Sequence, residues 1–301
     1  MTTPKAPSHA WAHVLLWVIP GLWSSNYLIA RLSRGVIPAH LLALGRWTLA
    51  FALLLPVVGA ALWQQRAVVR QEWLRCLVLG AMGMWVCGAF VYLGGQTTTA
   101  TNIAIIYAIT PVAIAAASVR LMGERLRAGQ VAGLLMALVG VLVVICQGDI
   151  DRLLAVRFTV GDAWILAAAA SWTGYSLGLK HWPSRLSPLV RLAAIILGGL
   201  CVLLPMSALE AWLQPDAWRA AFHLPALGLI ALAALLPGVL SYSAHAYLQR
   251  ELGAAKTALL LYLAPIYGAG LAWWFLGEVP GWPHVAGAAL ILPSIWLATR
   301  D

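Results

Sequence analysis

The sequence predicts an all-α membrane protein in which ten transmembrane helices form two inverted repeats of five helices each. Three observations support this fold class. Of the 301 residues, 62% are hydrophobic and only 10% are charged, whereas soluble domains carry about 25% charged residues. The apolar residues lie in runs of about 20, which is the length that crosses a bilayer as a helix. Finally, a set of residues in the first half recurs at similar spacing in the second half.

Ten apolar runs predict the transmembrane helices in chain order. They cover residues 11–30, 39–60, 74–93, 100–122, 131–145, 161–179, 189–209, 224–248, 254–276 and 283–298. Turn-forming and helix-breaking residues separate the runs, such as Gly94-Gly95, Pro183-Ser184 and Pro215-Asp216. About 100 residues remain for loops and ends, too few for an extramembrane domain. Such long runs exclude a soluble enzyme and an outer-membrane barrel, whose strands alternate in polarity.

The distribution of Lys and Arg predicts the orientation. With a cytoplasmic N-terminus, the inner segments hold 12 of these residues and the outer loops hold 5. Because cytoplasmic loops are enriched in Lys and Arg, we expect both termini inside, in a bacterial inner membrane. The first run lacks a small-residue cleavage site and is expected to remain as a helix. The net charge of +9 then reflects basic loops beside membrane lipid, and no nucleic-acid partner is expected.

An internal repeat is clearest at a shift of 154 residues. This shift aligns Pro111 with Pro265, Gly123 with Gly277, Glu124 with Glu278 and Gly133 with Gly287. We expect one repeat over residues 1–148 and the other over 149–301. Because five is an odd number, corresponding helices must cross the membrane in opposite directions. Inverted repeats are typical of secondary transporters, in which the substrate binds near the midplane between the halves.

The spacing of the repeated motif resembles a known family. In the first copy Pro111 is followed by Gly123-Glu124-Arg125-Leu126 and then by Gly133, and residues 238–298 hold a weaker copy with Val279 in place of the arginine. This pattern resembles the duplicated EamA domain of the drug/metabolite transporter superfamily. The Trp-rich sequence is most similar to bacterial exporters of aromatic amino acids of the YddG type. The resemblance implies a central cavity surrounded by helices one, three, four, six, eight and nine.

Polar and aromatic residues share faces on these helices at helical spacing. The candidate substrate-binding residues are Trp17, Ser24, Trp85, Tyr92, Tyr107, Trp164, Ser171, Tyr175, Ser241, Tyr242, His245 and Tyr262. Each has an alternative role in helix–helix packing, and His245 is also a candidate proton switch. As a set they predict a wide, aromatic, weakly polar cavity that suits a flat, partly apolar ligand.

Prolines inside the predicted helices are candidate hinges or gates. Pro111 and Pro265 lie mid-helix, and Pro237 is followed by Gly238. Each proline removes one backbone hydrogen bond, so it produces either a static kink or a hinge for rocking. Glu124 and Glu278 precede helix N-termini, whose dipole favours an acid; they are either structural or part of a gate.

Two arginines lie at the edges of predicted spans. Arg46 falls several residues inside the second helix and Arg191 starts the seventh. Either their side chains extend to the nearer interface, or they attract a carboxylate group of the substrate.

Several absences narrow the predicted function. No Asp or Glu lies well inside a span, whereas ion-coupled carriers commonly use an intramembrane carboxylate. No ATP-binding loop and no catalytic motif is found, so neither an enzyme nor a metal or other cofactor is expected. The prediction is an exporter of aromatic amino acids or related small metabolites, without intramembrane carboxylate coupling, working by alternating access as a monomer or weak homodimer. The alternative is a multidrug or nucleotide-sugar-like carrier.

Overall fold

The first repeat contains the first five predicted helices. The computed structural model describes residues 9–149, 151, 157–276 and 279–299. The first, second, fourth and fifth spans are α1 (His9–Leu32), α2 (Ala39–Gln64), α6 (Ala100–Met122) and α7 (Ala128–Ile145). A short α3 (Arg66–Gln71) leads into the third span, which is interrupted by a π-helical segment. It consists of α4 (Trp73–Gly80), η1 (Ala81–Val86) and α5 (Cys87–Gly94).

The second repeat follows the same order and is interrupted twice. The sixth, seventh and tenth spans are α9 (Val160–His181), α10 (Pro188–Leu213) and α16 (Trp282–Thr299), with a short α11 (Pro215–Ala220) after α10. The eighth span consists of α12 (Leu224–Ala234), the π-helical η2 (Leu235–Leu240) and α13 (Ser241–Leu252). The ninth consists of α14 (Ala254–Ala258), the 3₁₀ segment η3 (Leu259–Leu263) and α15 (Ala264–Leu276). The predicted all-helical fold is confirmed, and the predicted helix starts lie close to those observed.

Length and composition alone identify a subset of these helices as membrane-crossing. Within the described residues, six helices are long and apolar enough to span a bilayer. They are Ala39–Gln64, Arg66–Gly94, Asn102–Met122, Ala128–Ile145, Pro188–Leu213 and Leu224–Leu252. Two shorter apolar helices cover Val14–Ala30 and Trp282–Leu297.

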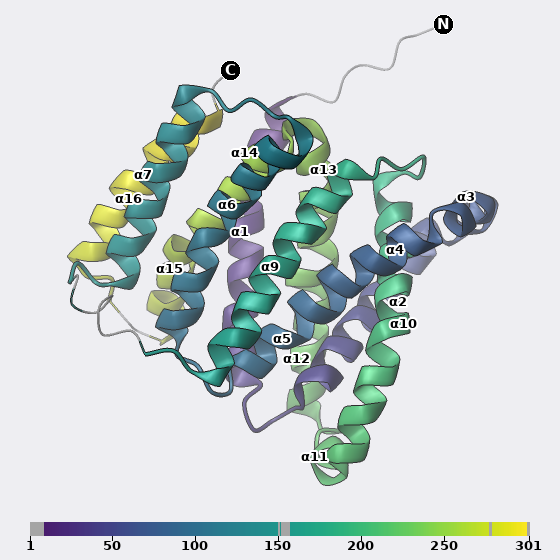
Figure 1. Ribbon diagram of the computed structural model, residues 1–301. Coiled ribbons are helices and arrows are strands. Elements are labelled where there is room, and N and C mark those ends of the chain that lie inside the picture. The colour runs from purple at the N-terminus through teal and green to yellow at the C-terminus, as the bar shows by residue number, and fades with distance from the viewer. Residues whose placement is uncertain (1–8, 150, 152–156, 277–278, 300–301) are drawn as a thin grey trace, which may run out of the picture.

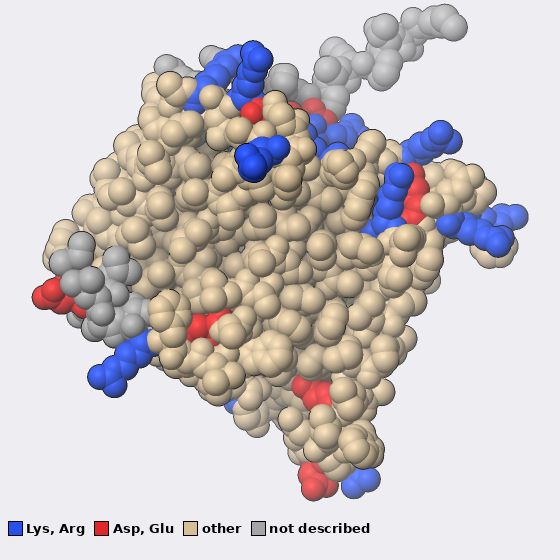
Figure 2. Space-filling model, viewed as in Figure 1, with Lys and Arg blue, Asp and Glu red and all other residues tan. Residues whose placement is uncertain are grey.

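Lys and Arg side chains gather at one end of the bundle. Helix α1 begins and α16 ends at the same end, where α3 and the α9–α10 connection also lie (Figure 1). On the face shown in Figure 2, most Lys and Arg side chains surround this end, and a broad band without them separates it from the opposite end. We call it the basic end.

Corresponding helices of the two repeats run in opposite directions. Helix α1 runs away from the basic end, whereas α9, the first helix of the second repeat, runs toward it (Figure 1). The interruptions follow the repeat as well, because η1 and η2 are separated by the same 154 residues as the sequence motif. The internal repeat therefore extends to local backbone geometry.

Glycines allow close helix contacts between the two halves. A Cβ atom at Gly80 would lie 2.2 Å from the backbone N of Gly199, so α4 and α10 touch through their backbones. A Cβ atom at Gly140 would lie 2.9 Å from the carbonyl O of Gly287, where α7 packs against α16. Small residues at such crossings are typical of membrane helices.

Candidate substrate site

A cavity of about 430 Å³ lies at the basic end between α9, α10 and α13. Its rim includes the exposed residues Lys180, Pro183 and Arg250, so it is open at that end. Its deep wall is formed by Tyr175 together with apolar residues such as Ile195. The cavity volume lies within the range of small-ligand sites, which is about 300–1,000 Å³.

A cluster of aromatic rings continues inward from Tyr175. Trp172 stacks on Tyr175 with ring centroids 5.3 Å apart. Its ring also lies 5.2 Å from Trp23 of α1, 5.2 Å from His245 and 5.7 Å from Tyr242, both of α13. We call Trp23, Trp172, Tyr175, Tyr242 and His245 the aromatic cluster. It joins one helix of the first repeat to two of the second.

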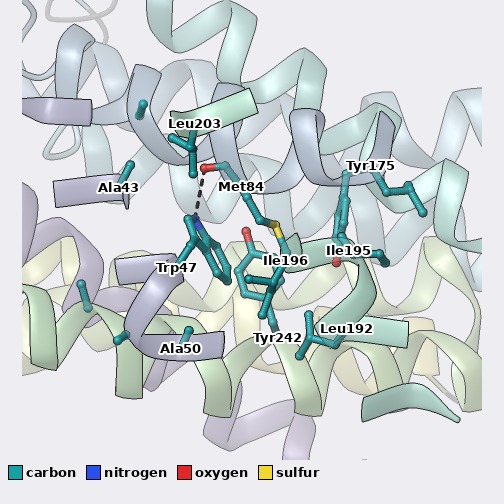
Figure 3. Packing of buried hydrophobic residues seen from close by; sticks show 14 of the residues in the cluster. Ala43, Trp47, Ala50, Met84, Tyr175, Leu192, Ile195, Ile196, Leu203 and Tyr242 are labelled. Atoms are coloured by element: carbon teal, nitrogen blue, oxygen red, sulfur yellow. Dashed lines mark hydrogen bonds between the residues drawn. The ribbon is translucent and has the colours of Figure 1, made fainter. Parts of the chain in front are cut away.

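Trp47 of α2 extends this cluster toward η1. Its ring lies 4.8 Å from that of Tyr242, and its Nε1 donates a hydrogen bond of 3.1 Å to the carbonyl of Met84. Figure 3 shows this bond, with Tyr242 beside Trp47 and Tyr175 further along the same packed core. Both Trp47 and Tyr175 are almost fully buried.

Side chains donate additional hydrogen bonds to carbonyls of the π-helical segments, of which Met82 and Leu236 also accept backbone N–H groups. In η1, Ser171 donates to Met82 at 2.9 Å and Tyr242 donates to Gly83 at 3.1 Å. In η2, Ser241 donates to Leu236 at 2.8 Å. π-helical turns are rare and frequently occur at functional sites.

Arg46 lies beside the cluster in a polar network of four groups. It is only 3% exposed, so its side chain does not extend to the interface, which rules out one of the two roles expected for it. Its Nη1 donates to Asn26 Oδ1 and to the Tyr92 hydroxyl, each at 3.3 Å, and its Nη2 donates to the Pro237 carbonyl at 2.7 Å. The Tyr92 hydroxyl donates in turn to Asn26 at 2.8 Å.

Arg191 has a different environment from Arg46. It is half-buried and lines the cavity. Its guanidinium donates to the carbonyls of Leu179 at 3.0 Å and Trp182 at 2.5 Å. These carbonyls lie at the C-terminal end of α9, where a cation is favourable, so Arg191 caps this helix end.

The structure brings part of the predicted set together. Tyr175, Tyr242 and His245 meet in the aromatic cluster, and Tyr92 joins Arg46. Trp85 and Trp164 form a second row of rings with Phe90 between them, at 5.6 and 4.8 Å. The predicted serines bind backbone carbonyls: Ser24 those of Pro20 and Ala264, and Ser171 and Ser241 those of the π-helical segments.

Other predicted residues lie apart from the cluster. Trp17 is 41% exposed, and Tyr107 packs with Ile106 and Ile165. Tyr262 is 1% exposed, and its hydroxyl has no hydrogen-bond partner within the described residues. These positions remain predictions.

Four cluster or network residues were missing from the predicted substrate-binding set and from the two arginines considered beside it. They are Trp23, Asn26, Trp47 and Trp172. Helical spacing contains a signal for Trp172, because it lies three residues before Tyr175 and therefore on the same face. No comparable signal identifies Trp47, since helix two was not expected to border the cavity.

The candidate hinge residues fall in different backbone environments. Helix α6 remains α-helical through Pro111, whereas Pro265 follows η3 at the start of α15. Pro237 and Gly238 lie inside η2 and are buried. Of the two repeated acids, Glu124 forms an ion pair with Lys180, and Glu278 lies outside the described residues.

Two acids are buried at helix ends on the side opposite the basic end. Asp162, in the first turn of α9, is 1% exposed and accepts hydrogen bonds from Thr98 and Asn102. Glu210, in the last turn of α10, is 8% exposed and faces His40 Nδ1 at 3.0 Å. The sequence indicated their place at helix ends but not their burial. In the described part of the chain no group of three His, Cys, Asp or Glu side chains could hold a metal ion.

The comparisons with known proteins agree with this architecture. A sequence profile of the EamA-like transporter family matches residues 11–146 and 159–300. A solved crystal structure superposes with a TM-score of 0.76 over 97% of both chains, at 23% identity, which supports the fold.

Three curated relatives cover most of the chain. An uncharacterized transporter of Archaeoglobus fulgidus is 23% identical over 95% of this chain and 96% of its own. A "probable terminal-alkyne amino-acid exporter" of Streptantibioticus cattleyicolor is 27% identical over 98% and 95%. The aromatic amino acid exporter YddG of Ancylobacter novellus is 26% identical over 72% and 71%. With two family matches spanning nearly its whole length, this chain belongs to the EamA-like transporter family and is a transporter rather than an enzyme.

Proposed function

We propose that this protein exports aromatic amino acids, or related small flat metabolites, across a bacterial inner membrane by alternating access. The observation that carries the proposal is the aromatic cluster that continues inward from the deep wall of the cavity. Membership of the EamA-like transporter family supports a small-molecule substrate. Two of the relatives are named as amino-acid exporters, which supports the substrate class.

The aromatic cluster suits a flat ring. Trp172 makes stacked, tilted and edge contacts with four other rings. Such pairs contribute about 0.5–1.5 kcal/mol each beyond the burial of their surface. A substrate ring that enters from the cavity would replace one of these contacts with another of the same kind, so opening the cluster costs little net energy.

The position of the cavity fits export. Because cytoplasmic loops are enriched in Lys and Arg, we assign the basic end, with both termini, to the cytoplasm. The cavity then opens toward the cytoplasm, from which an exporter takes its substrate. At the opposite end, the hydrogen bonds of Asp162 join α9 to α6, and those of Glu210 join α10 to α2, which favours a conformation whose opening lies at the basic end.

Transport without a coupling carboxylate is part of the proposal. Asp162 accepts hydrogen bonds from Asn102 and from the backbone of Thr159. Glu210 accepts them from His40, the backbone of Leu41 and Trp218. Carboxylates with this many donors are stabilised in their charged form as helix caps and crosslinks, which favours a structural role over proton exchange during transport.

Uptake into proteoliposomes tests the proposal. Labelled tryptophan, phenylalanine and lysine would be supplied with and without a proton gradient. We expect saturable uptake of the two aromatic amino acids, no uptake of lysine, and no effect of the gradient. The Trp172→Ala variant should lose about tenfold in tryptophan uptake, because about 1.4 kcal/mol of ring contact corresponds to that factor.

The matched control is Trp212→Ala. Trp212 is 77% exposed near the end of α10, so this variant should transport like the unmodified protein. Trp172→Phe keeps a ring at the site and should recover part of the lost uptake if Trp172→Ala folds poorly. Uptake of flat cations or nucleotide sugars in place of aromatic amino acids would overturn the substrate class and favour the alternative carrier.

A further inference from the structure

Arg46 is a buried cation without an acidic partner. The described ion pairs join Glu210 to His40, Glu124 to Lys180, and the exposed or half-exposed pairs on α11 and α13; none includes Arg46. All three described hydrogen-bond acceptors of its guanidinium are neutral oxygens. Its Nε is buried and has no hydrogen-bond partner within the described residues.

Such an arrangement is costly unless an anion completes it. Removing an ion from water costs several kcal/mol, and neutral acceptors offset only part of this. Charged residues inside membrane segments are rare and typically mark substrate or ion pathways. Arg46 lies about two turns from the start of α2, so the cost is not avoided by contact with water at the interface.

The guanidinium also adjoins the aromatic cluster. Its Cζ lies 4.7 Å from the ring centroid of Trp47 and 6.0 Å from that of Tyr242. The Tyr242 ring in turn contacts Trp172. A molecule with a flat ring and a carboxylate on a short chain could therefore place its ring in the cluster and its carboxylate at Arg46.

We infer that Arg46 binds the carboxylate of the transported substrate, a deduction that rests on the proposed function and specifies its substrate class. A carboxylate accepts two parallel hydrogen bonds from a guanidinium and does so about twice as strongly as a neutral oxygen. It therefore displaces the Pro237 carbonyl as the partner of Nη2 and also reaches the unpartnered Nε. Flat cations are excluded, because the buried positive charge repels them.

The same exchange connects binding to the contact between the repeats. Arg46 belongs to the first repeat, whereas Pro237 lies in η2 of the second. When the substrate carboxylate replaces the Pro237 carbonyl, η2 loses a side-chain bond that joins it to the first repeat. Substrate binding therefore loosens the interface that must move for alternating access.

Three indole compounds test the inference on the purified protein. Tryptophan carries both a carboxylate and an ammonium group, indole-3-propionate carries only the carboxylate, and tryptamine carries only the ammonium. Thermal stabilisation measures binding, and labelled tryptophan uptake measures transport. Tryptophan and indole-3-propionate should stabilise the protein, and tryptamine should not. In Arg46→Gln the binding of both carboxylates should weaken about tenfold to a hundredfold, the expected worth of a charged hydrogen bond.

Matched variants, together with the binding and uptake measurements, distinguish a failure of the Arg46 inference from a failure of the proposed function. Arg46→Lys keeps the charge but not the two-pronged geometry and should give an intermediate loss. Arg219→Gln removes an exposed arginine and should change nothing. If tryptophan is transported but Arg46→Gln binds it unchanged, the inference is wrong and the proposed function stands.

If indole-3-propionate stabilises the protein through Arg46 but tryptophan is not transported, the inference stands and the proposed substrate is wrong. Stabilisation by tryptamine equal to that by indole-3-propionate overturns the inference directly. Failure of both carboxylates to stabilise the unmodified protein overturns it as well. The melting temperature of each unliganded variant shows whether it folds.

Discussion

The two π-helical segments occupy equivalent places in the two repeats but are held by different partners. Three carbonyls of η1 accept hydrogen bonds from side chains of three other helices, α9, α13 and α2. In η2, one described side-chain bond comes from the next turn of the same helix and the other comes from Arg46.

The different donors suggest that the hydrogen bonds to η1 are permanent, whereas the bond from Arg46 to η2 can be exchanged for one to a ligand. The donors to η1 are neutral groups: Trp47 and Tyr242 are buried in the core, and Ser171 is half-buried. Each of these hydrogen bonds contributes about 0.5–1.5 kcal/mol. The interhelical donor to η2 is a cation, whose preferred partner is an anion. The same backbone irregularity is therefore rigid in the first repeat and open to exchange by a ligand in the second.

The largest expected effect comes from the crossing that supports η1. In Gly80→Ala the new methyl would lie 2.2 Å from the backbone of Gly199, and neither backbone can move without separating α4 from α10. We expect a loss of about 3 kcal/mol in unfolding free energy or a failure to fold, measured by denaturant titration in mixed micelles.

The equivalent residue of the second repeat and an open glycine provide the controls. The 154-residue shift aligns Gly80 with Ala234, which already carries a methyl and is fully buried. Gly228 of α12 has no atom within 4 Å of an added Cβ, so Gly228→Ala should be neutral or stabilising. A Gly80→Ala protein as stable as Gly228→Ala would contradict the tight support of η1.

Trp47→Phe should have the next largest effect. It removes the donor to Met84 in η1 and leaves a void in the core beside Tyr242. We expect a loss of about 2–3 kcal/mol in unfolding free energy. Tryptophan uptake measured in parallel should fall less than in Trp172→Ala, because the lost bond supports the backbone rather than the proposed ring site. Unchanged stability would show that η1 does not depend on this bond.

Tyr242→Phe isolates a single hydrogen bond of η1. The ring remains in the aromatic cluster and only the donor to Gly83 is lost, so the expected loss is about 1–2 kcal/mol. The binding of indole-3-propionate should stay within about twofold of the unmodified protein, since the ring contacts are kept. A larger loss of binding than of stability would instead place the Tyr242 hydroxyl on the substrate.

Ser241→Ala should have the smallest effect. Its hydroxyl bonds Leu236 one turn earlier in the same transmembrane span, so we expect about 0.5–1 kcal/mol. If η1 is the more firmly held segment, Ser241→Ala should lose less unfolding free energy than Tyr242→Phe in the same denaturant titration. The reverse order would mean that η2, rather than η1, is the more firmly held break.

The transmembrane helices were predictable because an uninterrupted run of apolar residues in the sequence identifies each of them. A bilayer requires about 20 consecutive apolar residues, and the predicted run over 100–122 coincides with α6. The position of the π-helical segments was not predictable in this way. Pro237 and Gly238 marked η2, but η1 contains no proline, and the repeat relation became visible only from the backbone.

The candidate site was predictable only in part. Tyr175 and Tyr242 were found from helical spacing, because residues three or four apart share a helix face. Arg46 was left with two possible roles, since burial depends on what the neighbouring helices contribute. Asn26, Tyr92 and Pro237 come from three different elements around it, and no spacing within α2 contains that information.

The sequence by itself determined the spans, the five-helix repeat and its inversion, and the family to which the chain belongs. These follow from the lengths of apolar runs, an odd number of helices and a repeated motif, all of which are local or periodic properties. Only the tertiary structure decided which rings meet at Trp172, which side chains hold η1 and η2, and that Arg46 is buried without an acid. Most of those contacts join residues far apart in the chain, and the packing of whole helices sets them.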